Sequence, residues 1–322
     1  MRRALLLFLL LFPAWADAAP LRVVASFLPL YAAAQSIGSG RAEVADLGVG
    51  GADPHDFSPK PSDLKKIAQA DLLVVNGLGL ESWLEPTVKE VGAGKLVVVD
   101  ASAGFDYLPN PHTLVIPEPM ILGDFPNGGR IHVEKPETNA PVPASPANVN
   151  PHVWLDPLLH ARQAQAIAAA MEKADPANAA FYHANLQAYL ARVWALDEKF
   201  KALFAALPAG EKNLVTFHDA FPYFAARYGL HYLGSVEEFP EKAPSPRQLE
   251  RLTDLIRKNR VGVLFAEEGY EPKLLQTLAA QTGARVAQLD TLEVGPPAAD
   301  AYFVRMEANL DALRKAWEKT SP

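Results

Sequence analysis

Short apolar segments alternate with amphipathic ones over much of the chain. Residues 71–76 (DLLVVN) and 95–100 (KLVVVD) are continuous apolar runs, typical of strands buried on both faces. Further strand-like segments lie at 21–27 and 43–49, and the segments that fit helices are 28–37, 58–70 and 81–91. Strands that alternate with helices indicate a parallel sheet covered by helices on both sides.

The same alternation returns in the last third of the chain. Strands are expected at residues 213–217, 231–236, 261–267 and 285–290. Helices are expected between and after them, at 220–228, 245–259, 272–282 and 300–319. No close sequence repeat relates the two halves, yet both follow the same order of strand and helix. The pattern therefore predicts two α/β lobes.

A single apolar stripe separates the two halves. Asp175 followed by Pro176 is a favourable helix start, because Asp caps a first turn and Pro fits inside it. Apolar residues then recur in steps of four and three, at positions 182, 186, 189, 193, 196, 200, 203 and 207. This spacing predicts one helix of about 33 residues, on the order of 50 Å long. A helix that packs across both lobes and a coiled-coil dimer both fit the stripe.

The first eighteen residues resemble an export signal. Two arginines precede an apolar run at residues 4–15. An A-x-A cleavage motif follows and ends at Ala18, with Ala16 as a second candidate cleavage site. The run of about 12 apolar residues is too short for the ~20 that span a bilayer. Because the chain has no cysteine, no Cys-linked lipid anchor is expected. We predict a signal peptide that is cleaved, and a mature protein in the periplasm.

Residues 103–151 interrupt the alternation. This stretch holds ten prolines, so regular helix is not expected there, and a loop of this length is usually functional or mobile. The predicted organisation is therefore a signal peptide at 1–18, a first lobe at 19–174 with a Pro-rich loop at 103–149, a linking helix at 175–208 and a second lobe at 209–322.

Composition narrows the possible functions. Thirty basic against 37 acidic side chains give a net charge of −7 without a dense Lys/Arg run, which argues against nucleic-acid binding. The lack of cysteine excludes disulfides, thiolate metal sites and Cys nucleophiles. A content of 49% hydrophobic and 21% charged residues is that of an ordinary globular chain.

Three histidines lie at predicted junctions between strands and helices. His55 follows the strand at 43–49, His152 ends the Pro-rich stretch, and His218 follows the strand at 213–217. In open parallel sheets, ligands bind beyond the carboxyl ends of the strands, where such loops lie. Three neutral imidazoles that converge there would form a metal site. Each histidine taken alone is equally consistent with a hydrogen-bonding loop residue.

Several motifs around these histidines resemble one family. Residues 51–55 (GADPH), 150–157 (NPHVWLDP) and 217–221 (FHDAF) resemble, in order, the three histidine regions of the cluster A-I solute-binding proteins. Residues 265–267 (FAE) and 289–290 (LD) are similar to the closing portion of that family. Its members are the zinc- and manganese-binding components of ABC importers, and the resemblance covers nearly the whole chain after residue 18.

The resemblance implies a fold, a site and a function. The fold is α/β, with a four-stranded parallel sheet flanked by helices in each lobe and one long backbone helix that joins them. The implied metal ligands are His55 and His152 from the first lobe and His218 and Asp290 from the second. Glu267 is expected beside the site, either as a supporting group or as an extra ligand. The implied function is that of a monomeric carrier, not an enzyme, which passes its ion to an inner-membrane permease with a cytoplasmic ATPase.

The ligand set favours Zn²⁺ as the transported ion. In this family the third position tends to be His in zinc binders and Glu in many manganese binders, and here it is His218. Three imidazoles and one carboxylate suit tetrahedral Zn²⁺, whereas Mn²⁺ prefers more oxygen ligands. A manganese carrier stays open as an alternative. A zinc-dependent hydrolase is a rival from another class, although four protein ligands would leave no open position for water.

One departure from the family concerns the loop at 103–149. Many zinc-specific members carry a long loop rich in His and acidic residues at this place. Here the loop is rich in proline and contains only His112 and His132. These two histidines are either a sparse metal-gathering set or ordinary loop residues.

Overall fold

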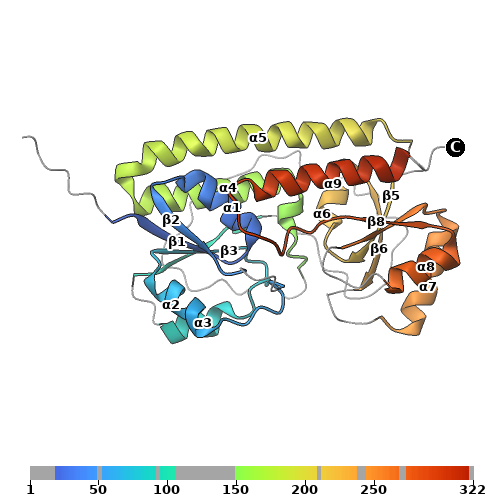
Figure 1. Cartoon of the computed structure of the whole chain (residues 1–322), viewed down its shortest axis with the longest axis horizontal. Coiled ribbons are helices and arrows are strands. Elements are labelled where there is room, and N and C mark those ends of the chain that lie inside the picture. The colour runs from blue at the N-terminus through green and yellow to red at the C-terminus, as the bar shows by residue number, and fades with distance from the viewer. Residues whose placement is uncertain are drawn as a thin grey trace, which may run out of the picture.

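Two four-stranded parallel sheets form the framework of the chain (Figure 1). The computed structural model describes residues 19–48, 53–91, 95–105, 149–208, 212–237, 244–267 and 273–318. The predicted signal peptide lies outside the described residues, as do residues 106–148 of the Pro-rich loop with His112 and His132.

Both sheets have the same strand order. The first follows β2-β1-β3-β4, with β1 at Leu21–Ala25, β2 at Ala42–Asp46, β3 at Leu72–Val75 and β4 at Val97–Asp100. The second follows β6-β5-β7-β8, with β5 at Asn213–His218, β6 at His231–Glu237, β7 at Val263–Ala266 and β8 at Arg285–Gln288. All neighbouring strands are parallel. The predicted fold class, α/β with one such sheet in each lobe, is confirmed.

One face of each sheet is covered by its own pair of helices. In the first lobe these are α2 (Pro61–Gln69) and α3 (Leu84–Val91), which share a buried apolar cluster with strand residues such as Leu73. In the second lobe they are α7 (Pro246–Lys258) and α8 (Lys273–Thr282), packed around residues such as Leu264. These faces are buried separately, so each lobe has a core of its own.

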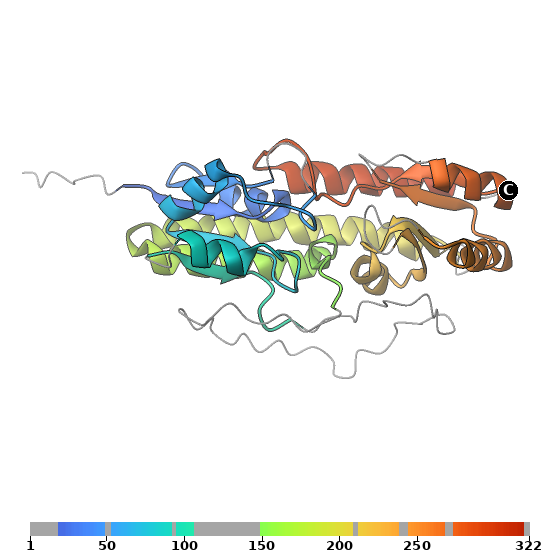
Figure 2. The same ribbon diagram turned by 90° about the horizontal axis from the view of Figure 1, so that it is seen from below.

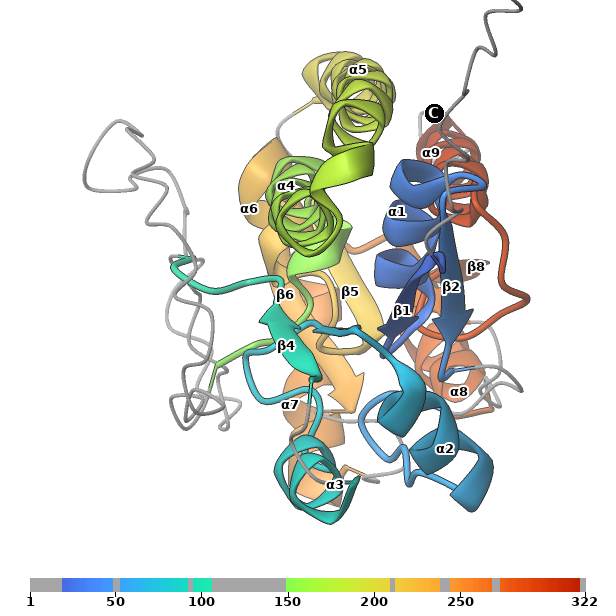
Figure 3. The ribbon, with the colours of Figure 1, turned by 90° about the vertical axis from the view of Figure 1, so that its left-hand side faces the viewer.

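The opposite faces of the two sheets share one core. It is built by α1 (Leu28–Gly38), α4 (Pro157–Ala174), α5 (Ala179–Ala205), α6 (Pro222–Tyr228) and α9 (Ala301–Glu318). Figures 1 and 2 show the two lobes placed end to end along α5, and Figure 3, seen from one end, shows α4 beneath α5. Because this buried cluster is continuous through both lobes, the helical layer ties them into one molecule.

The predicted linking helix is present in a slightly shorter form. A 3₁₀ turn at Pro176–Asn178 precedes α5, whose 27 residues end at Ala205. The stripe positions from 182 to 200 are buried, and 203 and 207 are partly buried. Since α5 packs on α1, α4 and α9, the stripe is used within this chain and the basis for a coiled-coil dimer is removed. None of the described helices has the length and hydropathy required to cross a membrane.

Candidate metal centre

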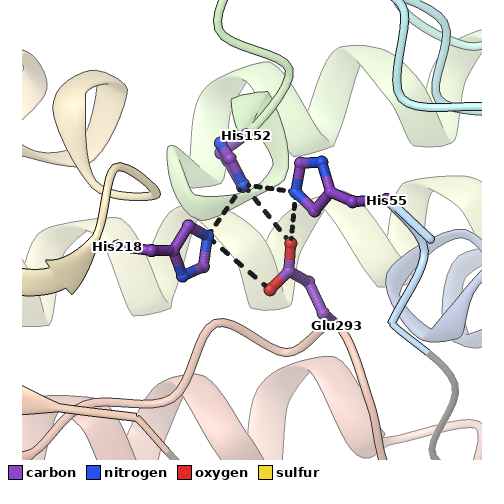
Figure 4. A group of neighbouring side chains, drawn as sticks. All are labelled: His55, His152, His218 and Glu293. Carbon is purple, nitrogen blue, oxygen red and sulfur yellow. Dashed lines mark hydrogen bonds and ion pairs between the residues drawn. The ribbon is translucent and has the colours of Figure 1, made fainter. Parts of the chain in front are cut away.

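Four side chains converge between the lobes: His55, His152, His218 and Glu293 (Figure 4). Their ligand atoms all lie within 4.8 Å of one another. His55 precedes α2, His152 precedes the 3₁₀ turn η1 (Val153–Leu155), His218 ends β5, and Glu293 follows β8. Four segments that are distant in sequence therefore meet at one point.

The distances in this group are close to those around a tetrahedral metal. His152 Nε2 lies 3.0 Å from His55 Nε2 and 3.1 Å from His218 Nε2. Glu293 Oε1 lies 3.2 Å from His55 Nε2 and 3.3 Å from His152 Nε2, while Oε2 lies 3.9 Å from His218 Nε2. Bonds of ~2.0–2.1 Å at tetrahedral angles would separate Zn²⁺ ligand atoms by about 3.3–3.4 Å.

The tautomer of His152 is set by Asn150. The amide Nδ2 of Asn150 donates to the backbone oxygen of Asp219 at 2.7 Å and to its Oδ2 at 3.2 Å, so Oδ1 of Asn150 must be an acceptor. His152 Nδ1 lies 2.9 Å from that oxygen and therefore carries the ring proton. The lone pair of Nε2 is left to face the group.

Glu267 sets the tautomer of His218 in the same way. Its Oε2 accepts from His218 Nδ1, and its Oε1 accepts from the backbone N–H of His218 at 3.0 Å. A carboxylate only accepts, so Nδ1 carries a proton and Nε2 faces the group. Glu267 is buried beside His218 and lies outside the four-residue group. Of the two roles expected for Glu267, this position fits a supporting group and not an extra ligand.

Burial and the neighbouring charges determine how the metal-free group is protonated. Burial lowers the pKa of His152 to about 3, so this imidazole is neutral. Burial also acts to lower the pKa of His218, but the carboxylates of Glu267 and Glu293 outweigh it and raise that pKa to about 9. Despite burial, the nearby charge of His218 holds the pKa of Glu293 well below its usual value. A proton on His218 thus balances the buried carboxylates when no cation is bound.

Exposure differs among the four side chains. His55 is 12% exposed, whereas His152, His218 and Glu293 are 2%, 0% and 3% exposed. An ion that enters the site has to reach three deeply buried ligand atoms, so the side of His55 is the expected point of entry.

The structure does not bring Asp290 into the group, which corrects the predicted fourth ligand. The carboxylate of Asp290 is paired with Arg305 of α9, with Oδ1 2.8 Å from Nη2 and Oδ2 bonded to Nε. Glu293, three residues further on, occupies the expected position instead. The sequence signal is a carboxylate in the segment after β8, and this signal alone does not distinguish Asp290 from Glu293.

Comparisons with known proteins find relatives along nearly the whole chain. Residues 23–316 match the family model described as "Zinc-uptake complex component A periplasmic". The "High-affinity zinc uptake system protein ZnuA" of Bacillus subtilis is 31% identical over 298 residues, which cover 91% of this chain and 86% of that protein.

Solved structures with bound metal ions share the fold. The Zn(II)-bound mutant variant of AdcAII from Streptococcus pneumoniae is 29% identical, with a TM-score of 0.73 over 92% of this chain and 98% of that one. FpvC from P. aeruginosa in complex with Ni²⁺ is 26% identical, with a TM-score of 0.76 over 94% of this chain and 98% of that one.

Proposed function

Because the chain belongs to the family of periplasmic zinc-uptake components, we propose that it is the high-affinity zinc-binding protein of an ABC importer. The observation that carries the proposal is the group of His55, His152, His218 and Glu293, whose ligand atoms lie within 4.8 Å of one another. We assign these four side chains as the zinc ligands. Three imidazole nitrogens and one carboxylate oxygen match the donors and the coordination number that Zn²⁺ prefers in proteins.

The proposed mechanism is capture between two lobes followed by delivery. His55 and His152 precede helices of the first lobe, whereas in the second lobe His218 ends β5 and Glu293 follows β8. A bound ion would therefore bridge the lobes and stabilise their closed arrangement. Because α5 packs against helices associated with both lobes, we expect release to involve small tilts and loop movements.

The donor set supports zinc over manganese and transport over hydrolysis. Similar folds are solved with Ni²⁺ and with Mn²⁺, so the fold alone does not select the ion. A nitrogen-rich sphere suits Zn²⁺ better than Mn²⁺, which favours oxygen. Four protein ligands also leave no open position for the water that a catalytic zinc requires.

We further propose the cellular setting from the family. Its description is periplasmic, which suits the signal peptide predicted at residues 1–18. In that compartment the protein would act as a monomer without enzymatic activity. It would deliver its ion to an inner-membrane permease that is driven by a cytoplasmic ATPase.

Metal analysis tests the proposal directly. We expect protein purified without chelators to contain about one zinc per chain, and an excess of Mn²⁺ to leave that zinc in place. A protein that takes up no zinc, or that exchanges it readily for Mn²⁺, would contradict the assignment. Assays of ester and phosphoester hydrolysis on the zinc-loaded protein are expected to be negative, and turnover would favour the hydrolase instead.

A further inference from the structure

The segment that carries Glu293 is held from the second lobe by α9. Asn309 accepts from the backbone N–H of Asp290 at 2.7 Å and donates to its carbonyl oxygen at 2.7 Å. Arg305 pairs with the carboxylate of Asp290 and also donates to the carbonyl oxygen of Val294. Residues on either side of Glu293 are therefore fixed to one helix.

A second attachment comes from the first lobe. The indole N–H of Trp154 donates to the carbonyl oxygen of Thr291 at 2.8 Å. Trp154 follows His152 by two residues, and Thr291 precedes Glu293 by two residues. A direct hydrogen bond thus joins the segments of two proposed ligands that lie in different lobes.

The indole of Trp154 is itself tightly held. The side chain is fully buried, its ring packs edge-on against Phe27 at 4.6 Å, and it lies 5.1 Å from the ring of His152. The hydroxyl of Tyr302 donates to the carbonyl oxygen of Trp154 at 3.1 Å. A rigid aromatic group with a single donor N–H can fix the position of a partner carbonyl at little cost in side-chain entropy.

We propose that Trp154 is a positioning residue that places Glu293 against the three histidines and thereby raises the affinity for zinc. This role rests on the proposed function of the site. Ligand groups have to be held to within about 0.5 Å of their working geometry, and Glu293 Oε1 lies 3.2 Å and 3.3 Å from imidazoles of the other lobe. The bond from Trp154 to Thr291 and a zinc ion held by all four ligands would both link the two lobes, so each is expected to favour the other.

Removal of the indole N–H tests the role. Trp154→Phe keeps an aromatic ring and deletes the donor, and we expect it to weaken zinc affinity about tenfold and to speed release into a chelator. The matched control is Trp194→Phe, because Trp194 lies on α5 and is 52% exposed. This control is expected to bind zinc as the wild type does. If Trp154→Phe does not fold, benzothienylalanine at position 154 removes the N–H and keeps the bicyclic shape.

A double-mutant cycle separates positioning from a merely structural effect. If Trp154 acts through Glu293, adding Trp154→Phe to the Glu293→Gln variant should change zinc affinity by less than about twofold. An equal loss in both backgrounds, or no loss in either, would overturn the role while the proposed function stands. A wild type that fails to bind zinc would overturn the proposed function, and the role of Trp154 with it.

Discussion

At the scale of single residues, the protonation of His218 determines how zinc binding depends on pH. The pKa of this imidazole is raised to about 9 because Glu267 and Glu293 outweigh the effect of burial. Zinc can bind Nε2 only after the ring loses one proton. Protons and zinc therefore compete for His218 throughout the neutral range.

We predict that zinc binding at pH 7 releases about one proton per ion, and that affinity rises about tenfold per pH unit between about 6.5 and 9. Calorimetry in buffers with different ionisation enthalpies measures the proton count, and competition with a chelator measures the affinity. Binding without proton release would show that His218 is already neutral. In the metal-free protein the raised pKa has the opposite effect, because its stabilisation is complete below about pH 6.5 and is lost toward pH 9.

A pair of variants separates the two carboxylates of the segment after β8. Glu293→Gln is expected to weaken zinc affinity by at least about 100-fold, because it removes a buried anionic ligand. Asp290→Asn breaks the pair with Arg305 and is expected to cost about 1–2 kcal/mol of stability, with a much smaller effect on affinity. Chelator competition and urea unfolding measure the two effects. An Asp290→Asn variant that loses zinc as Glu293→Gln does would restore the original ligand assignment.

Much of the site could be predicted from the sequence, and the exception has a physical cause. His55, His152 and His218 lie at junctions that follow from the alternation of strands and helices. Which carboxylate after β8 reaches them depends on Arg305, which belongs to a different element and holds Asp290 against α9. No periodic pattern in the sequence predicts the contact between Arg305 and Asp290.

At the scale of elements, the packing of α5 against its neighbouring helices depends on its apolar stripe. Phe200 is fully buried and packs with Phe204, Phe224 and Tyr228, which links α5 to α6. The spacing of the stripe predicted this helix to within a few residues of its end. It did not identify the partner, because a stripe of this kind is equally suited to a second copy of the chain.

Phe200→Ala is expected to lower the free energy of unfolding by about 3–5 kcal/mol, since it opens a cavity where α5 meets α6. Trp194→Ala on the exposed side of α5 is the control, with an expected change within about 0.5 kcal/mol. Urea denaturation of the metal-free protein measures both. Similar losses in the two variants would mean that α5 is not packed as described.

At the scale of the whole molecule, a buried ion network joins three helices. Arg227 of α6 donates to both carboxylate oxygens of Asp197 in α5, at 2.7 Å and 2.9 Å. Its Nε also lies 3.3 Å from Asp156, whose carboxylate caps the start of α4. The guanidinium of Arg227 therefore links α6, the long helix α5 and the start of α4.

Arg227→Gln should destabilise the protein by about 3–5 kcal/mol at pH 7, because it leaves the buried carboxylate of Asp156 without a cation, whereas Asp197 keeps Lys201 at 2.8 Å. Arg227→Lys keeps the charge and is expected to lose less. Thermal unfolding at several pH values tests this reasoning. Burial raises the pKa of Asp156 to about 6, above its unfolded value, so the destabilised variant should recover part of its stability as the pH falls through 6.

Buried groups inside and outside the site give the metal-free fold a shallow dependence on pH. Burial raises the pKa of Glu81 to about 7, which adds stability as the pH falls. Burial lowers the pKa of His152 and of His160 to about 3, which removes stability as the pH falls below about 6.5. These contributions oppose each other. We therefore expect the protein at pH 5 to have lost its zinc and kept its circular dichroism spectrum, and simultaneous loss of both would contradict this.

The core shared by both sheets also limits how the proposed permease could recognise the loaded protein. Since one continuous apolar layer passes under α5 from end to end, the empty molecule cannot swing wide apart without exposing that layer to water. Scattering envelopes of the loaded and empty forms should be nearly superimposable. If the permease distinguishes them, it must then respond to local changes at the surface beside His55, the most exposed of the four side chains.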